Sequence, residues 1–192
     1  MSSGTLMRMI IVHKLGGRWQ RRVGLLAAMV CAGIVGVVAF RAYEAPVPRV
    51  LRLADGTEVF YLSNTKITPS STYPHPREIK IDGEAFIRAA AADQPLIVRS
   101  RLMLLTVVGK SALRVTARSN ETGEETDVLY GHVEAKKAYP SRQNEPDTLL
   151  AGEEVMVNET IDLQEKETAD VPALRAWSDA LVTSAERRSG GR

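Results

Sequence analysis

The stretch RVLRLADGTEVFYL, residues 49–62, carries the clearest fold signal in the chain. Two apolar-bearing runs, VLRL and EVFYL, flank the segment Ala54-Asp55-Gly56-Thr57. An Asp-Gly pair between such runs is typical of a tight turn, because glycine accepts a positive φ and aspartate bonds its own backbone. The stretch therefore predicts a β-hairpin whose turn contains Asp55 and Gly56.

Short segments with the same character follow the hairpin. REIKIDGEAFI, residues 77–87, alternates polar and apolar residues, and its pair Asp82-Gly83 predicts another turn before Ala85 and Phe86. Later runs are PLIVRS, LMLLTVVG, ALRVTARS, TDVLYGHVEA and EEVMVNETIDL, with turns expected at positions that include Gly109, Gly131 and Gly152. This spacing predicts an all-β domain over residues 50–162, either sandwich-like or solenoid-like.

Residues 163–192 are predicted to form an acidic linker, a short helix and a flexible tail. The helix is indicated by apolar residues at helical spacing, with Pro172 acceptable in the first turn. These apolar residues are Val171, Leu174, Trp177, Leu181 and Val182.

An apolar run, VGLLAAMVCAGIVGVVAF, occupies residues 23–40 and has about the shortest length at which a helix crosses a bilayer. Five basic residues and no acidic ones precede it, which by the positive-inside rule predicts a cytoplasmic segment at 1–22. A cleaved signal peptide is the alternative, although its apolar region is usually shorter and ends in an A-x-A-like site. The sequence favours a retained transmembrane helix, a linker over residues 41–49 and an external β domain.

Small residues recur at intervals of four within this run, at Gly24, Ala28, Ala32 and Gly36. Such a stripe lets a second helix approach closely, which predicts pairing with another copy or with another sensor. Glycine and alanine are also common in membrane helices without pairing, so this alternative stays open.

Charge and cysteine usage exclude several classes of function. Beyond Arg41 the chain has 19 basic and 23 acidic residues, which gives a net charge of −4, so no nucleic-acid partner is expected. The basic segment at 1–22 suits anionic lipid headgroups. The single cysteine, Cys31, lies in the apolar run, and the three histidines lack the spacing of metal ligands. We therefore expect neither a cofactor nor a metal.

No catalytic constellation is visible in the sequence. Gly109-Lys110-Ser111 resembles the end of a phosphate loop, but Leu104 stands where the required glycine should be. Glu84 is the single carboxylate of interest, since burial could make it a general acid, although hairpin carboxylates more often bond backbone amides or face water. The sequence predicts that the protein is not an enzyme, and an envelope enzyme using Glu84 is the alternative.

Several motifs together resemble the periplasmic domain of the FecR family. The family pattern L-x-D-G-[ST]-x-V corresponds to Leu53, Asp55, Gly56, Thr57 and Val59. The pattern R-x-V-x-L-x-G-E-A-F corresponds to Arg77, Ile79, Ile81, Gly83, Glu84, Ala85 and Phe86. The pattern G-x-V corresponds to Gly131 and Val133, and the closing W-x-x-G-x-L corresponds to Trp177, Ala180 and Leu181. The resemblance spans roughly residues 50–181, and G-E-A-F is its most specific element.

The resemblance implies a function in transmembrane signalling. FecR-family sensors relay the state of an outer-membrane transporter to an alternative (extracytoplasmic-function) sigma factor through protein–protein contacts. It implies a single-pass protein of the bacterial inner membrane with a periplasmic β domain, and a structural or partner-binding role for the motif residues. Because the family's cytoplasmic helical domain and second periplasmic domain are not matched, a membrane-anchored adaptor that pairs with a full-length sensor is the alternative.

Overall fold

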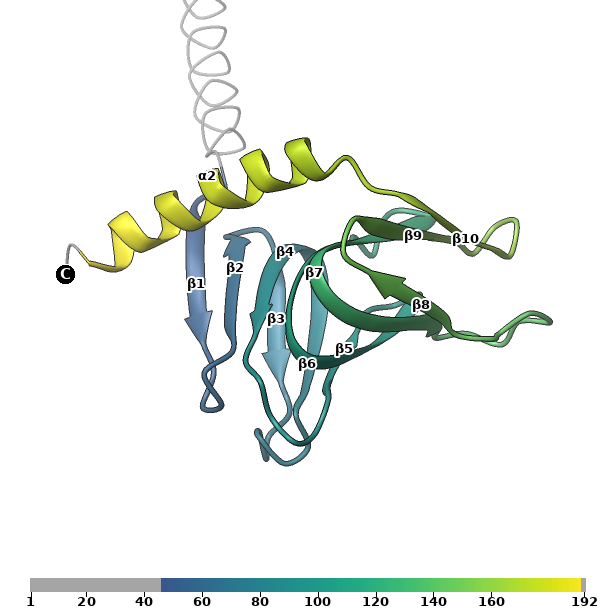
Figure 1. Ribbon diagram of the computed structural model, residues 1–192, viewed down its shortest axis with the longest axis horizontal. Coiled ribbons are helices and arrows are strands. Elements are labelled where there is room, and N and C mark those ends of the chain that lie inside the picture. The colour runs from purple at the N-terminus through teal and green to yellow at the C-terminus, as the bar shows by residue number, and fades with distance from the viewer. Residues whose placement is uncertain (1–45, 191–192) are drawn as a thin grey trace, which may run out of the picture. The chain divides into compact units, whose positions relative to one another are not determined.

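The computed structural model describes residues 46–190, which form a ten-stranded β-sheet and one helix (Figure 1). The strands are β1 (Pro48–Arg52), β2 (Glu58–Leu62), β3 (Lys66–Pro69), β4 (Glu78–Ala89), β5 (Leu96–Arg99), β6 (Met103–Ala117), β7 (Gly123–Lys137), β8 (Asp147–Leu150), β9 (Glu153–Asn158) and β10 (Leu163–Thr168), and the helix is α2 (Val171–Ser189). The main path through the sheet is β1-β2-β4-β5-β6-β7-β9-β10.

The predicted opening hairpin is confirmed. Strands β1 and β2 pair antiparallel, with Arg52 opposite Glu58 at the loop end. The loop is closed by the backbone amide of Leu53, which donates to the carbonyl oxygen of Thr57 at 2.8 Å. Gly56 has a φ of +84°, which is the conformation for which glycine is favoured in a turn.

The turns predicted at Gly83, Gly109 and Gly131 are wrong. Each of these glycines lies inside one of the three long strands, β4, β6 and β7, with φ values of +128°, +62° and +103°. A positive φ bends a strand or forms a bulge as readily as it reverses the chain, so the sequence signal is the same in both cases. The pairing of β6 with β7 shows register shifts between Val108 and Leu113, a stretch that includes Gly109.

The bends give each long strand two sets of partners. Residues 78–82 of β4 pair with β3 and β5, whereas residues 83–89 pair with β2 and β6. Likewise, β7 pairs with β9 before Gly131 and with β8 after it. The sheet therefore folds over on itself in a sandwich-like manner, with β1 and β2 at one end and β8 to β10 at the other (Figure 1).

The main hydrophobic core lies inside the folded sheet. In β4, alternate residues are buried, as expected for a strand with one face toward a core. Fully burying one aliphatic side chain contributes roughly 1.5–3 kcal/mol, so a core of this size can outweigh the entropy cost of ordering the chain. The largest fully buried apolar side chains in this core include Ile79, Ile87, Leu96, Leu102, Met103, Leu105, Leu113 and Leu149.

The predicted C-terminal helix is present as α2, and it covers part of the outer face of the sheet (Figure 1). The side chain of Asp170 caps the helix by accepting from the amide of Ala173 at 3.0 Å, and Pro172 lies in the first turn. A second apolar cluster joins helix to sheet; its buried members are Phe60, Phe86 and Ala112 from the strands and Leu181, Val182 and Ala185 from α2.

Two predictions are corrected by these findings. The predicted fold class placed a transmembrane helix before the β domain, and the predicted localisation was the bacterial inner membrane with the β domain in the periplasm. Within residues 46–190 the fold is mostly β-sheet with one C-terminal helix, and no helix there is both long and apolar enough to cross a bilayer. Eighteen apolar residues are near the lower limit for a span, so the run alone does not establish one. The run at 23–40, its Gly24/Ala28/Ala32/Gly36 stripe and the segment at 1–22 lie outside the described residues.

Candidate functional site

A buried ion pair connects two of the sequence motifs. Asp55 lies in the β1–β2 loop and Arg77 immediately precedes β4. The Nη2 and Nε atoms of Arg77 lie 2.6 Å and 2.8 Å from Oδ2 of Asp55, and the two side chains are 4% and 8% exposed. Residues 22 positions apart in the sequence thus share one contact that solvent does not reach.

The remaining polar atoms of this ion pair are also satisfied. Arg77 donates to the carbonyl oxygen of Ala90 at 3.0 Å and to that of Gln94. The fully buried Thr57 donates its hydroxyl to Asp55 at 2.9 Å and accepts from the amide of Ala90 at 3.2 Å. The network therefore fastens the β1–β2 loop to the chain that follows β4.

The network also shifts two pKa values. Burial by itself would raise the pKa of Asp55, but the neighbouring Tyr73 hydroxyl, Thr57 and Arg77 outweigh it and hold that pKa below its usual value of 3.8. Burial and the adjacent Asp55 carboxylate raise the pKa of Tyr73 to about 12. The Tyr73 hydroxyl is buried close to Asp55 but forms no hydrogen bond of ordinary geometry within residues 46–190. At neutral pH, Asp55 is therefore ionised and Tyr73 is neutral.

The motif glycines Gly83 and Gly131 lie at two bends of the same construction. A Cβ at Gly83 would lie 2.7 Å from Cα of Thr65, and one at Gly131 would lie 2.6 Å from Cα of Ser111. In both bends the hydroxyl group bonds the amide of the residue after the glycine: Thr65 Oγ1 accepts from Glu84 at 3.0 Å, and Ser111 Oγ accepts from His132 at 3.2 Å. These glycines are thus required by close backbone approach as well as by their φ values.

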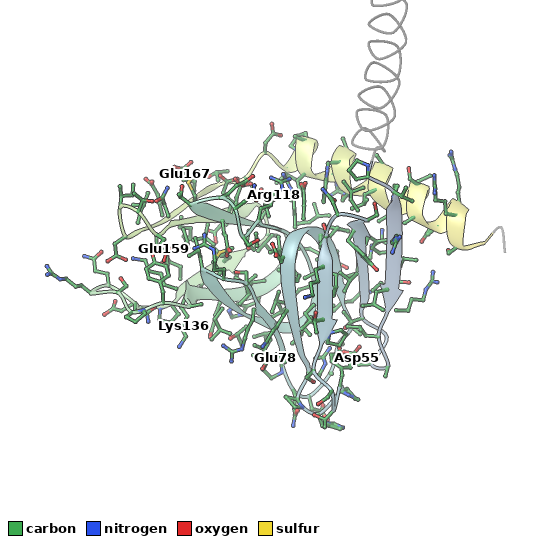
Figure 2. The ribbon with its side chains drawn as sticks, turned by 180° about the vertical axis from the view of Figure 1, so that it is seen from behind. Asp55, Glu78, Arg118, Lys136, Glu159 and Glu167 are labelled. Atoms are coloured by element: carbon green, nitrogen blue, oxygen red, sulfur yellow. The ribbon has the colours of Figure 1, made fainter. Side chains whose placement is uncertain are left out.

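Glu84 is held between two arginines. Its Oε1 lies 2.9 Å from Nη2 and 3.0 Å from Nε of Arg114, and its Oε2 lies 3.0 Å from Nη2 of Arg118. A polar cleft of about 370 Å³ opens beside these groups and is also lined by Asn64 and Asn120. Figure 2 shows Arg118 on the opposite side of the domain from Asp55, so the two polar networks are separate. Both carboxylate oxygens of Glu84 are therefore engaged in ion pairs with these arginines.

Arg114 also connects Glu84 to helix α2. Its guanidinium carbon lies 4.9 Å from the centre of the Trp177 ring, which is typical of a cation–π contact. The Trp177 ring in turn meets Phe86 edge to face, with ring centres 6.4 Å apart and an interplanar angle of 84°. Three predicted motif residues, Glu84, Phe86 and Trp177, are therefore brought together, while Ala85 is fully buried in the core.

Replacing Trp177 with alanine should loosen this contact between helix and sheet. Trp177 is half-buried, so we expect a loss of about 2 kcal/mol, below the ~3–5 kcal/mol typical of a fully buried tryptophan. Urea unfolding followed by circular dichroism would measure it. Asp179→Ala, at an exposed position of the same helix, is the control and should change stability by less than about 0.5 kcal/mol.

A cluster of carboxylates lies where β7 pairs with β9, and no motif in the sequence points to it. Glu125, Asp127 and Glu154 each place a carboxylate oxygen within 4.8 Å of the others. Asp127 is 4% exposed. Burial, together with the nearby charge of Glu125, raises its pKa to about 7, and burial also raises the pKa of Glu154. Only the register of the two strands, with Asp127 opposite Glu154, reveals the cluster.

The raised pKa of Asp127 predicts a pH-dependent stability. The folded state keeps this proton up to about pH 7, whereas an unfolded aspartate releases it near 3.8, so stability should fall as the pH rises between these values. Asp127→Asn removes the cost of holding a buried negative charge at high pH. With EDTA present to remove divalent cations, this variant should be more stable than the wild type at pH 8 by roughly 1–3 kcal/mol. At pH 4 the difference should largely vanish. Thermal unfolding across this pH range would measure it, with Asp179→Asn as the control; a gain independent of pH would contradict the prediction.

Comparisons with known proteins identify the class of fold. No protein-family model and no curated protein matches the sequence. Solved structures do match, and two of them are crystal structures of a "putative anti-sigma factor" from Parabacteroides distasonis ATCC 8503. One is 24% identical with a TM-score of 0.59, covering 69% of this chain and 63% of that one. The other is 26% identical with the same TM-score, covering 69% and 62%.

The described domain therefore has an anti-sigma-factor-like fold. The chain spans less than two thirds of the length of either solved structure. The match does not single out the FecR family, which remains an interpretation of the sequence motifs.

Proposed function

We propose that the protein is a regulator in sigma-factor signalling that acts by protein–protein contacts. The observation that carries this proposal is the shared fold with two proteins described as putative anti-sigma factors. A fold alone hosts many functions, so the proposal also needs the site. The arrangement around Glu84 supports binding, because its carboxylate is engaged by Arg114 and Arg118 beside an open polar cleft.

In its finer form, the proposal names the partners. We propose that the regulated protein is an alternative (extracytoplasmic-function) sigma factor and that the signal comes from an outer-membrane transporter, as the FecR resemblance implies. The motifs support this, because Asp55 and Arg77 form one network and Glu84, Phe86 and Trp177 form another. Motif residues that contact one another in the fold are better evidence for a resemblance than isolated sequence matches.

The experiment is removal of the protein from the cell that encodes it, followed by sequencing of the RNA. We expect transcripts of one alternative sigma factor's promoters, including those of a transporter gene, to change several-fold and to be restored by the full-length chain. An unchanged transcript profile would overturn the proposal.

Crosslinking in the same cells would then identify the direct partner. A photoreactive residue at the exposed Asn120, beside the cleft, should capture a protein that the same residue at Glu145 does not. Capture of a sigma factor or of a transporter's signalling domain would support the finer form of the proposal. Capture of a full-length sensor alone would instead support the adaptor alternative.

We further propose that no chemical step is involved. Glu84 was the one carboxylate of catalytic interest in the sequence, and its ion pairs support a binding or structural role. If Glu84→Gln left the fold and the crosslinked partner at Asn120 unchanged but abolished the transcriptional response, while Glu84→Asp did not, an acid–base role would have to be reconsidered.

A further inference from the structure

The cluster of Glu125, Asp127 and Glu154 is built by strand geometry. Residues two apart on a strand face the same side, so Glu125 and Asp127 of β7 point together, and Glu154 of β9 lies directly opposite Asp127. Their carboxylate oxygens lie within 4.8 Å of one another. Because both strands are paired on both sides within the sheet, the backbone positions of the three residues are fixed.

One oxygen of this cluster lacks a partner. Oδ2 of Asp127 is buried and accepts no hydrogen bond from any residue between 46 and 190. The nearest cation is Nη1 of Arg114, at 3.9 Å, which is too far for a hydrogen bond, and Arg114 bonds Glu84 with its other nitrogen atoms. An unsatisfied buried carboxylate oxygen is costly, so this position favours a positive group that can pair with it.

A neighbouring unsatisfied hydroxyl group and the local negative charge also favour a positive group at this position. On β6, Thr116 lies opposite Glu125, and its buried Oγ1 also has no hydrogen-bond partner among the described residues. On β10, Glu167 lies opposite Glu154 and adds a fourth carboxylate to the row. Figure 2 shows Glu167 on the same side of the domain as Arg118. When all four carboxylates are ionised, their negative charge is therefore larger than Arg114 can neutralise.

We propose that Glu125, Asp127 and Glu154 bind a divalent cation of the size of Ca²⁺ on this face of the sheet. Carboxylate oxygens favour hard cations. Ligand oxygens lie about 2.3–2.6 Å from Ca²⁺ and about 2.0–2.1 Å from Mg²⁺, so opposite ligands lie about 5 Å and 4 Å apart, respectively. Carboxylate oxygens that all lie within 4.8 Å of one another are compatible with the spacing of ligands around Ca²⁺. This site is independent of the proposed signalling function.

Calcium titration of the full-length, EDTA-treated chain tests the proposal. We expect one ion to bind, with a dissociation constant on the order of 10⁻⁴ M, as measured by calorimetry, and to raise the midpoint of thermal unfolding. Glu154→Gln should weaken binding at least tenfold, and so should Asp127→Asn, which is expected to fold. Glu165→Gln, at an exposed position of β10, is the matched control and should leave binding unchanged.

Luminescence of Tb³⁺ would locate the ion. Trp177 lies against Arg114, whose guanidinium faces Asp127, so excitation of tryptophan should sensitise Tb³⁺ at this site. Trp177→Phe should lower the emission several-fold while calcium still binds by calorimetry.

Three results would overturn the proposal. They are the absence of stoichiometric binding to the wild type, undiminished binding to both carboxylate variants, and tighter binding of Mg²⁺ than of Ca²⁺. Each of them is independent of whether the protein regulates a sigma factor.

Discussion

Asp55→Ala is expected to lower the free energy of unfolding by about 3–5 kcal/mol, because it leaves the guanidinium of Arg77 buried without its carboxylate. The loss is large because Arg77 is 4% exposed and cannot turn to water without opening the loop that follows β4. Urea unfolding at pH 7, followed by circular dichroism, would measure it. The variant also removes the acceptor for the Thr57 hydroxyl, which adds to the loss.

The control for this prediction is Asp93→Ala, an exposed aspartate in the loop that Arg77 fastens, which should cost less than about 0.5 kcal/mol. Replacing Arg77 with Met in the Asp55→Ala background should recover part of the stability, since the uncompensated charge is then gone. Equal losses in Asp55→Ala and Asp93→Ala would show that the ion pair does not stabilise the fold.

The same ion pair predicts a pH dependence of opposite sign to that of Asp127. The pKa of Asp55 is lower in the folded state than its usual value of 3.8, so its contribution is complete above that pH and is lost as the pH falls below it. The stability difference between wild type and Asp55→Ala should therefore shrink in acid.

Gly131→Ala is expected to cost about 3–5 kcal/mol. The new Cβ would lie 2.6 Å from Cα of Ser111, which is backbone and cannot move aside, and the φ of +103° strains any residue with a side chain. Backbone strain of about 1–3 kcal/mol and overpacking of about 1–3 kcal/mol combine here. Chemical denaturation would measure the loss.

Gly109→Ala separates these two causes. Gly109 also has a positive φ, at +62°, but an added Cβ would meet no atom within 4 Å. We expect this variant to cost about 1–2 kcal/mol, the usual penalty for a side chain in the left-handed region. If the two variants lost the same stability, backbone conformation alone would explain the glycines and the close approach to Ser111 would not matter.

Local signals in the sequence predicted the elements whose formation is decided locally. The β1–β2 hairpin follows from Asp55-Gly56 between two apolar runs, and α2 follows from the helical spacing of residues such as Leu174 and Leu181. The pair Asp82-Gly83 failed as a turn signal, because the contact that determines its role is with Thr65, which only the folded chain brings near. A preference for positive φ is local, whereas the choice between a turn and a bend depends on strand pairing.

The candidate sites likewise combine residues that local motifs indicate with contacts that only the folded chain creates. The sequence motifs included Asp55, Arg77 and Glu84, but which of them would pair could not be predicted, since their partners depend on how distant segments meet. Asp127 and Glu154 have no motif at all. They become neighbours through the register of β7 against β9, and a shift of one residue would turn Glu154 to the other face.

The three bent strands have a further consequence for how the domain loses its structure. Because β4, β6 and β7 each run through both halves of the folded sheet, the two halves share the main hydrophobic core and the hydrogen-bond ladders of these strands. One half cannot separate while the other stays intact, since the same backbone serves both. The domain should therefore melt in one cooperative step, and amide protons on the two sides of Gly83 or Gly131 should exchange with solvent through the same global opening.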